Sequence, residues 1–179
     1  YIDKLFEKHE AVIDWKQYLR RFGTRSSKIE TKKTRKKPNN RFGSGPALKI
    51  KPKRNTLVAI DTSGSVSDQD LIEFFNEIDQ IHKTGTTVTI MECDSYVHRT
   101  YDYNGKTDVL RVTGRGGTSF DPVMEEIFKS GGKYQNLIYL TDGFAPAPER
   151  VPMIPILWVI NSSAQLNPEL PGAQIQIKR

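Results

Sequence analysis

The chain has 179 residues, which suits one domain with an appendage and allows a core that needs no disulfide bonds. Its single cysteine, Cys93, excludes a disulfide framework and a cysteine-rich zinc site. No apolar run approaches the roughly eighteen residues that span a bilayer, and no signal peptide is evident. We therefore expect a cytoplasmic protein without a membrane segment.

The net charge of +6 conceals two parts of opposite charge. Residues 20–54 carry fourteen Lys or Arg and one acidic residue, Glu30, whereas the rest of the chain carries 13 basic and 20 acidic residues. This distribution predicts an acidic body with a basic segment, not a uniformly basic surface. Three interpretations of the basic segment stay open: a solvated linker, a strap docked on the acidic body, or a contact with nucleic acid.

The first part of the chain divides into a predicted helix and a predicted connector. Residues 1–23 carry apolar residues at three- and four-residue steps before Gly23, which predicts an amphipathic helix. A lone helix of this kind is marginally stable, so we expect it to pack against another part of the chain. Residues 24–55 contain three prolines and no helical period, which predicts a basic connector that is partly extended, with a short strand at residues 47–50. Its composition suits a mobile segment.

From residue 56 onward, strand and helix patterns alternate, which predicts an α/β domain over residues 56–179. The region 96–112 alternates enough to suggest a hairpin, with its turn near Asn104-Gly105. Short apolar runs are typical of buried strands in a mostly parallel sheet, and they occur at residues 56–60, 86–91, 136–140 and 155–160, with a last edge strand at 174–177.

Two helices are expected between these strands. The first begins after Ser67, which forms a capping box with Asp70, and it ends at Gly85. The second begins at Asp121, which is expected to be its N-cap. In such a sheet the loops at the carboxyl ends of the strands are where ligands bind.

Three short motifs fall at those carboxyl ends. Asp61 to Ser65 follows the first strand, Gly116 to Thr118 precedes the second helix, and Thr141 to Gly143 follows a later strand. Their side chains offer oxygen only, which is the ligand that hard divalent cations prefer. The sequence therefore predicts a site for Mg²⁺, or for Mn²⁺ or Ca²⁺ in its place, held by Asp61, Ser63, Ser65, Thr118 and Asp142. The alternative is that these groups only cap helices and satisfy loop amides.

The order and spacing of these motifs resemble the metal-ion-dependent adhesion site of von Willebrand factor A (VWA) domains. The resemblance covers about residues 55–179 and is strongest to the VWA-like domain at the C-terminus of bacterial predicted metallopeptidases. Upstream, Trp15 and the basic segment are similar to the region that precedes this domain in that family. The resemblance implies a Rossmann-like three-layer sandwich with a β-hairpin edge and a divalent cation at the five named positions.

The same resemblance implies how the site would work. An acidic side chain of a protein partner would complete the coordination shell of the metal, and MoxR-type AAA ATPases are the implied partner class. We therefore expect a metal-dependent protein-interaction module in a larger predicted metallopeptidase or ATPase-associated system. The alternative function is a nucleic-acid-binding module that uses the basic residues 28–54.

An enzyme is not expected. His9-Glu10 begins like a His-Glu-x-x-His zinc peptidase motif, but Ile13 stands where the second histidine is required. A P-loop motif is also missing from the sequence. The resemblance noted above is to the non-peptidase portion of that family, and it implies that the chain is the non-catalytic part of a predicted metallopeptidase.

For three residues at or after the second predicted strand, the sequence predicts a structural role or a place at the edge of the site. Asp94 ends that strand at the edge of the proposed site, where it is either a turn residue or a rim residue of the site. Cys93 is expected to be a buried apolar group, because no base lies beside it in the sequence. His98 has no evident partner and is expected at the surface.

Overall fold

The computed structural model describes residues 14–24, 28–38, 46–53, 55–62, 68–105 and 117–177. Within these ranges the chain forms three helices and eight strands. The elements are α1 (Trp15–Gly23), β1 (Lys28–Pro38), β2 (Pro46–Lys53), β3 (Asn55–Asp61), α2 (Asp68–Lys83), β4 (Thr87–Cys93), β5 (Val97–Asp102), α3 (Asp121–Lys129), β6 (Asn136–Thr141), β7 (Ile156–Ile160) and β8 (Ala173–Gln176).

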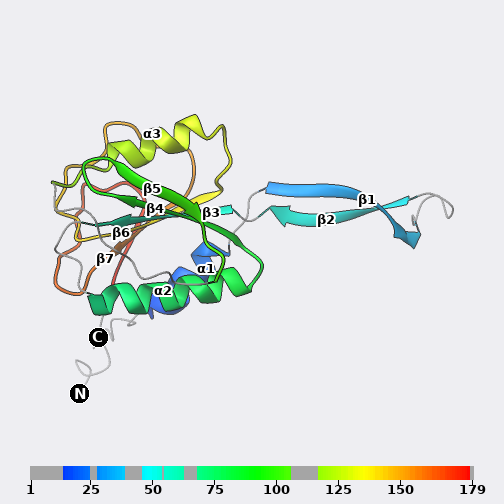
Figure 1. The fold of residues 1–179 in the computed structure, drawn as a ribbon, viewed down its shortest axis with the longest axis horizontal. Helices are drawn as coiled ribbons and strands as arrows, with labels where there is room; N and C mark the ends of the chain where they lie inside the picture. Colours follow the sequence, from blue (N-terminus) through cyan, green and yellow to red (C-terminus); the bar gives the residue numbers. More distant parts are fainter. Residues whose placement is uncertain are drawn as a thin grey trace, which may run out of the picture.

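A six-stranded sheet forms the centre of the molecule, in the order β5-β4-β3-β6-β7-β8 (Figure 1). Every neighbouring pair is parallel except β4 and β5, which are antiparallel. The predicted fold class, a mostly parallel sheet with an antiparallel hairpin at one edge, is therefore confirmed. The chain runs from β3 outward to β4 and β5, then returns to β6 on the other side of β3. The strand order thus reverses between β3 and β6, which is where ligands bind in open α/β sheets.

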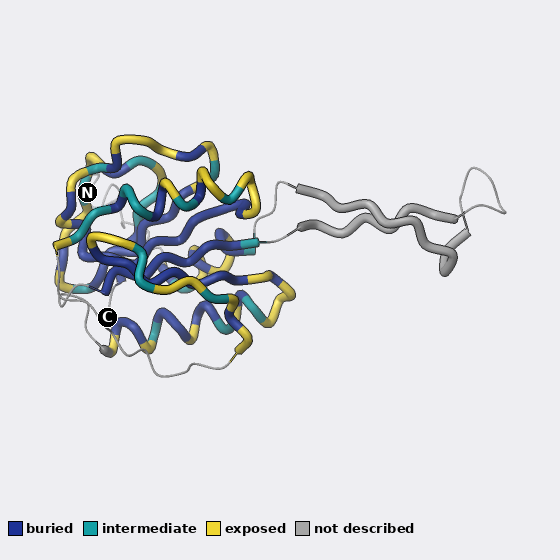
Figure 2. The backbone as a smooth tube through the Cα atoms, turned by 45° about the horizontal axis from the view of Figure 1, so that its top comes forward, coloured by how far each residue is buried: buried dark blue, intermediate teal, exposed yellow. Residues whose placement is uncertain are grey.

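Alternate residues of each central strand face two separate cores, because side chains alternate across a sheet. Val58 and Ile60 of β3 lie in the core that α1 and α2 cover. Leu57 and Ala59 of the same strand lie in the core that α3 covers. Figure 2 shows the result: buried strands between helices whose exposed residues lie on their outer sides. The predicted three-layer arrangement is confirmed.

Helix α1 completes one of these two layers. The carboxylate of Asp14 accepts a hydrogen bond from the Lys16 N–H at 3.0 Å, so Asp14 caps the helix. Trp15, Leu19 and Phe22 are buried in the core shared with α2. The connections from β6 to β7 and from β7 to β8 contain no helix. Helix α1 therefore covers part of the sheet that crossover helices cover in other parallel sheets.

The end of α1 is tied to the sheet where the strands begin. The carbonyl of Gly23 accepts a hydrogen bond from the Thr56 hydroxyl at 2.9 Å, and the carbonyl of Phe22 accepts one from the Asn136 side-chain amide at 2.8 Å. A Cβ on Gly23 would lie 2.6 Å from Cδ1 of Ile81, so glycine allows α1 to approach α2 closely. The expectation that this helix packs against the rest of the chain is confirmed.

The basic segment contains a second, separate sheet. Strands β1 and β2 pair antiparallel, from Lys28 opposite Lys53 to Pro38 opposite Pro46. Figure 1 shows this ribbon extending away from the α/β body, on the side where β3 begins. The two strands together contain nine Lys or Arg and one acidic residue. The strand predicted at residues 47–50 is confirmed within a longer β2. The sequence indicated no strand at the position of β1.

The antiparallel hairpin at the sheet edge is formed by β4 and β5 and turns at residues 94–96. β5 is the first arm of the hairpin that the sequence predicts over residues 96–112. The second arm lies outside the described residues, so the turn near Asn104-Gly105 stays a prediction. The helix predicted over residues 1–23 is described from Trp15 onward, and residues 1–13 lie outside the described part of the chain. In the part of the chain that the structure describes, every helix is too short or too polar to cross a bilayer.

Candidate functional site

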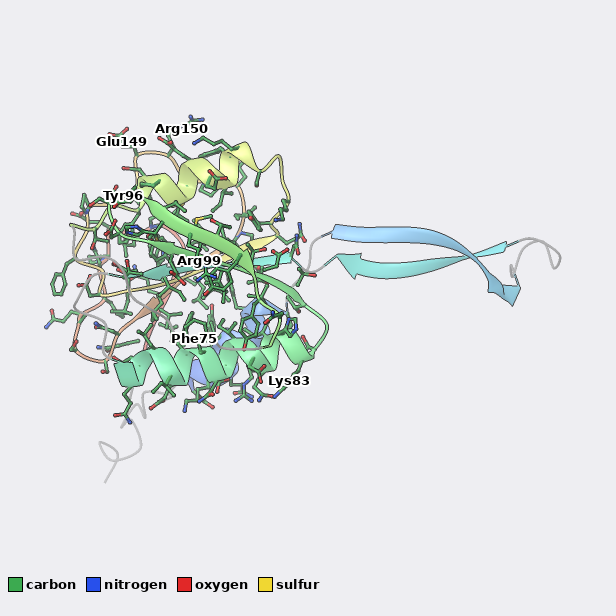
Figure 3. All side chains as sticks on the ribbon, in the orientation of Figure 1. Phe75, Lys83, Tyr96, Arg99, Glu149 and Arg150 are labelled. Atoms are coloured by element: carbon green, nitrogen blue, oxygen red, sulfur yellow. The ribbon has the colours of Figure 1, made fainter. Side chains whose placement is uncertain are left out.

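The candidate site lies at the carboxyl ends of the parallel strands, opposite the edge where α1 and the ribbon join the sheet. Figure 3 gives the orientation: Lys83 marks the end of α2 on the ribbon side, and Tyr96 marks the β4–β5 turn on the far side. A seven-residue strand such as β3 spans about 23 Å. The basic ribbon and the candidate site are thus rooted at opposite ends of the sheet.

Asp61 is the last residue of β3 and is 1% exposed. Its Oδ2 accepts a hydrogen bond from the Thr141 hydroxyl at 2.9 Å. Asp61 is paired with Cys93 of β4, and both the backbone N–H and the hydroxyl of Thr62 donate to the Cys93 carbonyl, at 2.9 and 3.2 Å. These bonds fix the backbone at the end of β3 and one oxygen of the Asp61 carboxylate. The carboxylate therefore has a defined position at the edge of the sheet.

Asp142 follows β6 directly and is 7% exposed. Its Oδ1 accepts a hydrogen bond from the Phe144 N–H at 3.1 Å, which closes a tight turn. Gly143 has a φ of 77°, a conformation that glycine adopts without strain, and its N–H donates to the Thr141 hydroxyl at 3.1 Å. Thr141 therefore connects the segments that carry Asp61 and Asp142, across the two strands where the strand order reverses.

Thr118 lies in the irregular loop before α3 and is half-buried. The residues on either side of it are bonded to the β4–β5 turn: the Ser95 hydroxyl donates to the Gly117 carbonyl, and the Ser119 N–H donates to the Asp94 carbonyl at 3.1 Å. On its other side the loop is anchored by Phe120, whose ring packs against two aromatic rings of the core. The centroid distances are 5.1 Å to Tyr139 and 4.7 Å to Trp158.

Ser63 and Ser65 lie outside the described residues, so their part in the site stays a prediction. The described residues bring three of the five to the same edge of the sheet: Asp61 ends β3, Asp142 directly follows β6, and Thr118 lies in the loop that bonds to the β4–β5 turn. The five-residue site as a whole is therefore still a prediction.

The donor chemistry of these residues fits a hard divalent cation. Two buried carboxylates in adjacent strand ends repel each other, and a cation offsets that repulsion. In the part of the chain that is described, Asp142 forms no ion pair with Lys or Arg. The described residues also contain no group of three or more His, Cys, Asp or Glu side chains that could hold a metal. The donors predicted beyond the two carboxylates are hydroxyls.

Asp94 proves to be a turn residue with more partners than the sequence indicated. Its Oδ1 accepts the Tyr96 N–H at 3.2 Å, and its Oδ2 lies 2.9 Å from Nε2 of His98. Burial raises the pKa of the Asp94 carboxyl, but His98 and the backbone N–H groups of Tyr96 and Ser95 outweigh burial and lower it below its ordinary value. His98 is therefore half-buried against Asp94, contrary to the expectation of a surface residue without a partner.

The core beneath the site contains a buried thiol. The Sγ of Cys93 lies 3.1 Å from the Tyr139 hydroxyl, and Tyr139 stacks on Trp158 with a centroid distance of 5.0 Å. Burial raises the pKa of the Cys93 thiol to about 12, against the smaller effect of the Tyr139 hydrogen bond. The expectation that Cys93 is buried is confirmed.

Two acidic residues have partners that the sequence did not indicate. Asp121 is the first residue of α3 and not its N-cap; Phe120 occupies the cap position, and the Asp121 carboxylate accepts the Glu149 N–H at 2.8 Å. Asp70, in the first turn of α2, reaches the turn after β7, where the Ser162 hydroxyl donates to it at 3.1 Å. The capping box expected with Ser67 falls on a residue outside the described ranges. Both acids thus tie a helix start to a distant loop, which no local pattern indicates.

Similarity to known proteins agrees with this fold. A family model described as a VWA-like domain (DUF2201) matches residues 56–178. The chain belongs to this family of VWA-like domains. VWA-like domains are generally non-catalytic interaction modules. The family therefore suggests that this domain is a protein-interaction module. The relationship to metallopeptidases that the sequence suggested stays a prediction.

Individual relatives are more distant. The chain is 29% identical over 141 residues to an uncharacterized protein of Thermotoga maritima, in an alignment that covers 76% of this chain and 34% of that protein. It is also similar to the ArnB paralog VWA2 from Sulfolobus acidocaldarius, whose crystal structure aligns with a TM-score of 0.46 and 14% identity over 65% of this chain and 39% of that chain. The chain thus spans between a third and two fifths of the length of these two proteins.

Proposed function

We propose that the protein is a cytoplasmic, metal-dependent protein-interaction module. A divalent cation, Mg²⁺ in the first instance, would be held by Asp61, Ser63, Ser65, Thr118 and Asp142. The bound cation would supply a positive charge that accepts a carboxylate from a partner protein. A MoxR-type AAA ATPase is the partner class that the sequence resemblance implies.

One observation supports this proposal above the others. Two carboxylates, Asp61 and Asp142, are buried at the ends of β3 and β6, where the strand order reverses, and Thr141 connects the segments that carry them. Carboxylates that only cap loops are usually solvated, because burial of an ionised group carries a high free-energy cost unless an opposite charge offsets it. A cation at this position would offset that cost and leave coordination places for outside oxygen ligands.

The first test is the effect of Mg²⁺ on unfolding. Urea unfolding curves would be measured with Mg²⁺ and with EDTA for the natural chain, Asp61→Ala and Asp142→Ala. We expect Mg²⁺ at a hundredfold excess over Kd to raise the free energy of unfolding of the natural chain by about 2.7 kcal/mol. Both variants should lose this increase. Asp79→Ala is the matched control. It also removes a carboxylate, but Asp79 pairs with Lys83 at the end of α2 that lies away from the candidate site.

The second test concerns the partner. Displayed random peptides would be selected in Mg²⁺ and eluted with EDTA, and we expect the eluted peptides to share an Asp or Glu that cannot be replaced by Asn or Gln. Identical unfolding curves in Mg²⁺ and EDTA would exclude the metal site. A clear Mg²⁺ response with selected peptides that lack an acidic residue would exclude the proposed mode of partner binding.

A further inference from the structure

We propose that the β4–β5 turn positions Thr118 in the candidate metal site, so that Asp94 and Ser95 act as positioning residues for a metal ligand that they do not themselves provide. This inference rests on the proposed function, since it concerns the affinity of the same site.

The loop that carries Thr118 depends on the turn for its position. Residues 117–119 are neither helix nor strand, so regular backbone hydrogen bonds do not fix them. The Ser95 hydroxyl bonds to the carbonyl before Thr118, and the Asp94 carbonyl bonds to the N–H after it. Thr118 is thus held from both sides by two consecutive residues of one turn.

The turn that holds this loop is itself well braced. Asp94 and Tyr96 are joined by two hydrogen bonds: Tyr96 donates its N–H to the Asp94 carboxylate at 3.2 Å, and Asp94 donates its N–H to the Tyr96 carbonyl at 3.1 Å. His98 lies against the other carboxylate oxygen of Asp94, and the Tyr96 ring covers His98 at a centroid distance of 4.3 Å. Asp94 itself is buried, whereas Tyr96 is exposed.

The turn is also connected through the sheet to the strand that carries Asp61, one of the candidate carboxylates. It continues β4 directly, and Cys93, the last residue of β4, is paired with Asp61 of β3. The bonds from the turn to residues 117 and 119 therefore connect the Thr118 loop to the strand end that carries Asp61. A hydroxyl is a weak neutral ligand, so its contribution to affinity depends on being held in place before the cation arrives.

The test uses Mg²⁺ alone as the probe, in isothermal titration of the whole chain. The variants are Ser95→Ala, which removes the hydroxyl, Ser95→Thr, which keeps it, and Thr118→Ala, together with the double variant Ser95→Ala/Thr118→Ala. Ser163→Ala is the matched control, because Ser163 bonds to Asn161 in another loop at the same edge. Unfolding in EDTA is measured for each variant, to separate loss of affinity from loss of fold.

We expect Ser95→Ala to weaken Mg²⁺ binding at least fivefold, with Ser95→Thr and Ser163→Ala within twofold of the natural chain. In the Thr118→Ala background, Ser95→Ala should change the affinity less than twofold, because the ligand that it positions is already gone. Equal effects of Ser95→Ala in both backgrounds would overturn the inference, as would natural affinity in Ser95→Ala. A natural chain that does not bind Mg²⁺ would instead overturn the proposed function.

Discussion

The hydroxyl of Thr141 donates a hydrogen bond to Oδ2 of Asp61 across 2.9 Å, from the end of β6 to the end of β3. The same hydroxyl accepts the N–H of Gly143 at 3.1 Å. One threonine thus determines the relative position of two strand ends and of the turn after Asp142. It is not among the five residues predicted as metal ligands, but it links the segments of two of them.

Replacement of Thr141 by Val should test this link. Valine has a similar shape, but it leaves the Gly143 N–H without its partner and removes one bond to the Asp61 carboxylate. We expect the free energy of unfolding in EDTA to fall by about 1–3 kcal/mol. Thr141→Ser keeps the hydroxyl and should lose less. Urea unfolding of both variants provides the measurement, and a Val variant as stable as the natural chain would show that the bond is not important.

Helix α1 should contribute strongly to stability, although it lies outside the matched family region. Leu19 is fully buried in the core shared with α2, whereas Tyr18 on the same helix is 37% exposed. We expect Leu19→Ala to lower the free energy of unfolding by about 2–5 kcal/mol, because it leaves a cavity. Tyr18→Ala should cost less than about 1 kcal/mol. Equal losses from the two substitutions in chemical denaturation would contradict the packing of α1 against the sheet.

Because of Cys93, the free energy of unfolding should fall as the pH becomes alkaline. Burial raises the pKa of its thiol to about 12 in the folded protein, above the value of about 8.5 expected in the unfolded chain. The folded state therefore favours the neutral thiol, and this contribution is complete below about pH 8.5 and is lost as the pH rises towards 12. The stability of the natural chain relative to Cys93→Ala should fall by up to about 1.4 kcal/mol per pH unit above pH 8.5.

The same thiol should resist alkylation. With iodoacetamide at pH 9, mass spectrometry should find Cys93 unmodified in the folded protein and modified after unfolding in urea, since the thiolate is the reactive form. Rapid modification of the folded protein, or a stability difference that does not change with pH, would show that the thiol is accessible to water.

The basic ribbon should be dispensable for the fold of the body. Its base is closed by the hydrogen bond between Gly23 and Thr56, so residues 26–53 can be replaced by a short Gly/Ser linker. We expect the free energy of unfolding to change by less than about 1 kcal/mol and the Mg²⁺ response to persist. Loss of the folded state in this variant, measured by circular dichroism, would show that the ribbon is part of the folding unit.

The shortened chain also separates the two functions considered for this protein. If the ribbon binds nucleic acid, the natural chain should bind duplex DNA with an affinity that falls steeply between 50 and 200 mM salt, and the shortened chain should not. EDTA should have no effect on such binding. DNA binding that is the same in both chains would exclude the ribbon as a nucleic-acid contact.

The strands that lie deepest in the sheet were the easiest to predict. Strands β3, β6 and β7 are buried along nearly their whole length, so their apolar runs are continuous and their ends fall within one or two residues of the prediction. Asp61 and Asp142 could be predicted to lie at one edge, because each follows a strand of a parallel sheet and the carboxyl ends of parallel strands meet at one edge. These features depend on local sequence and on a general rule of parallel sheets.

The contacts around the site could not be predicted in the same way. The Asp94–His98 pair, the bond from Asp121 to Glu149 and the bond from Asp70 to Ser162 all depend on how loops meet in three dimensions. Strand β1 was missed because its Lys- and Thr-rich sequence shows no apolar alternation. A helix cap predicted at Asp121 was wrong because Phe120 takes the cap position when its ring enters the core.

The placement of α1 has a practical consequence for truncation. The region that matches the family model begins at residue 56, but the sheet residues that share a core with Leu19 are apolar, such as Ile138 and Leu157. A recombinant fragment cut at the family boundary would present these residues to water, and large exposed apolar patches promote aggregation. We therefore expect the smallest fragment that folds on its own to include Trp15–Gly23, which a boundary drawn by sequence similarity would remove.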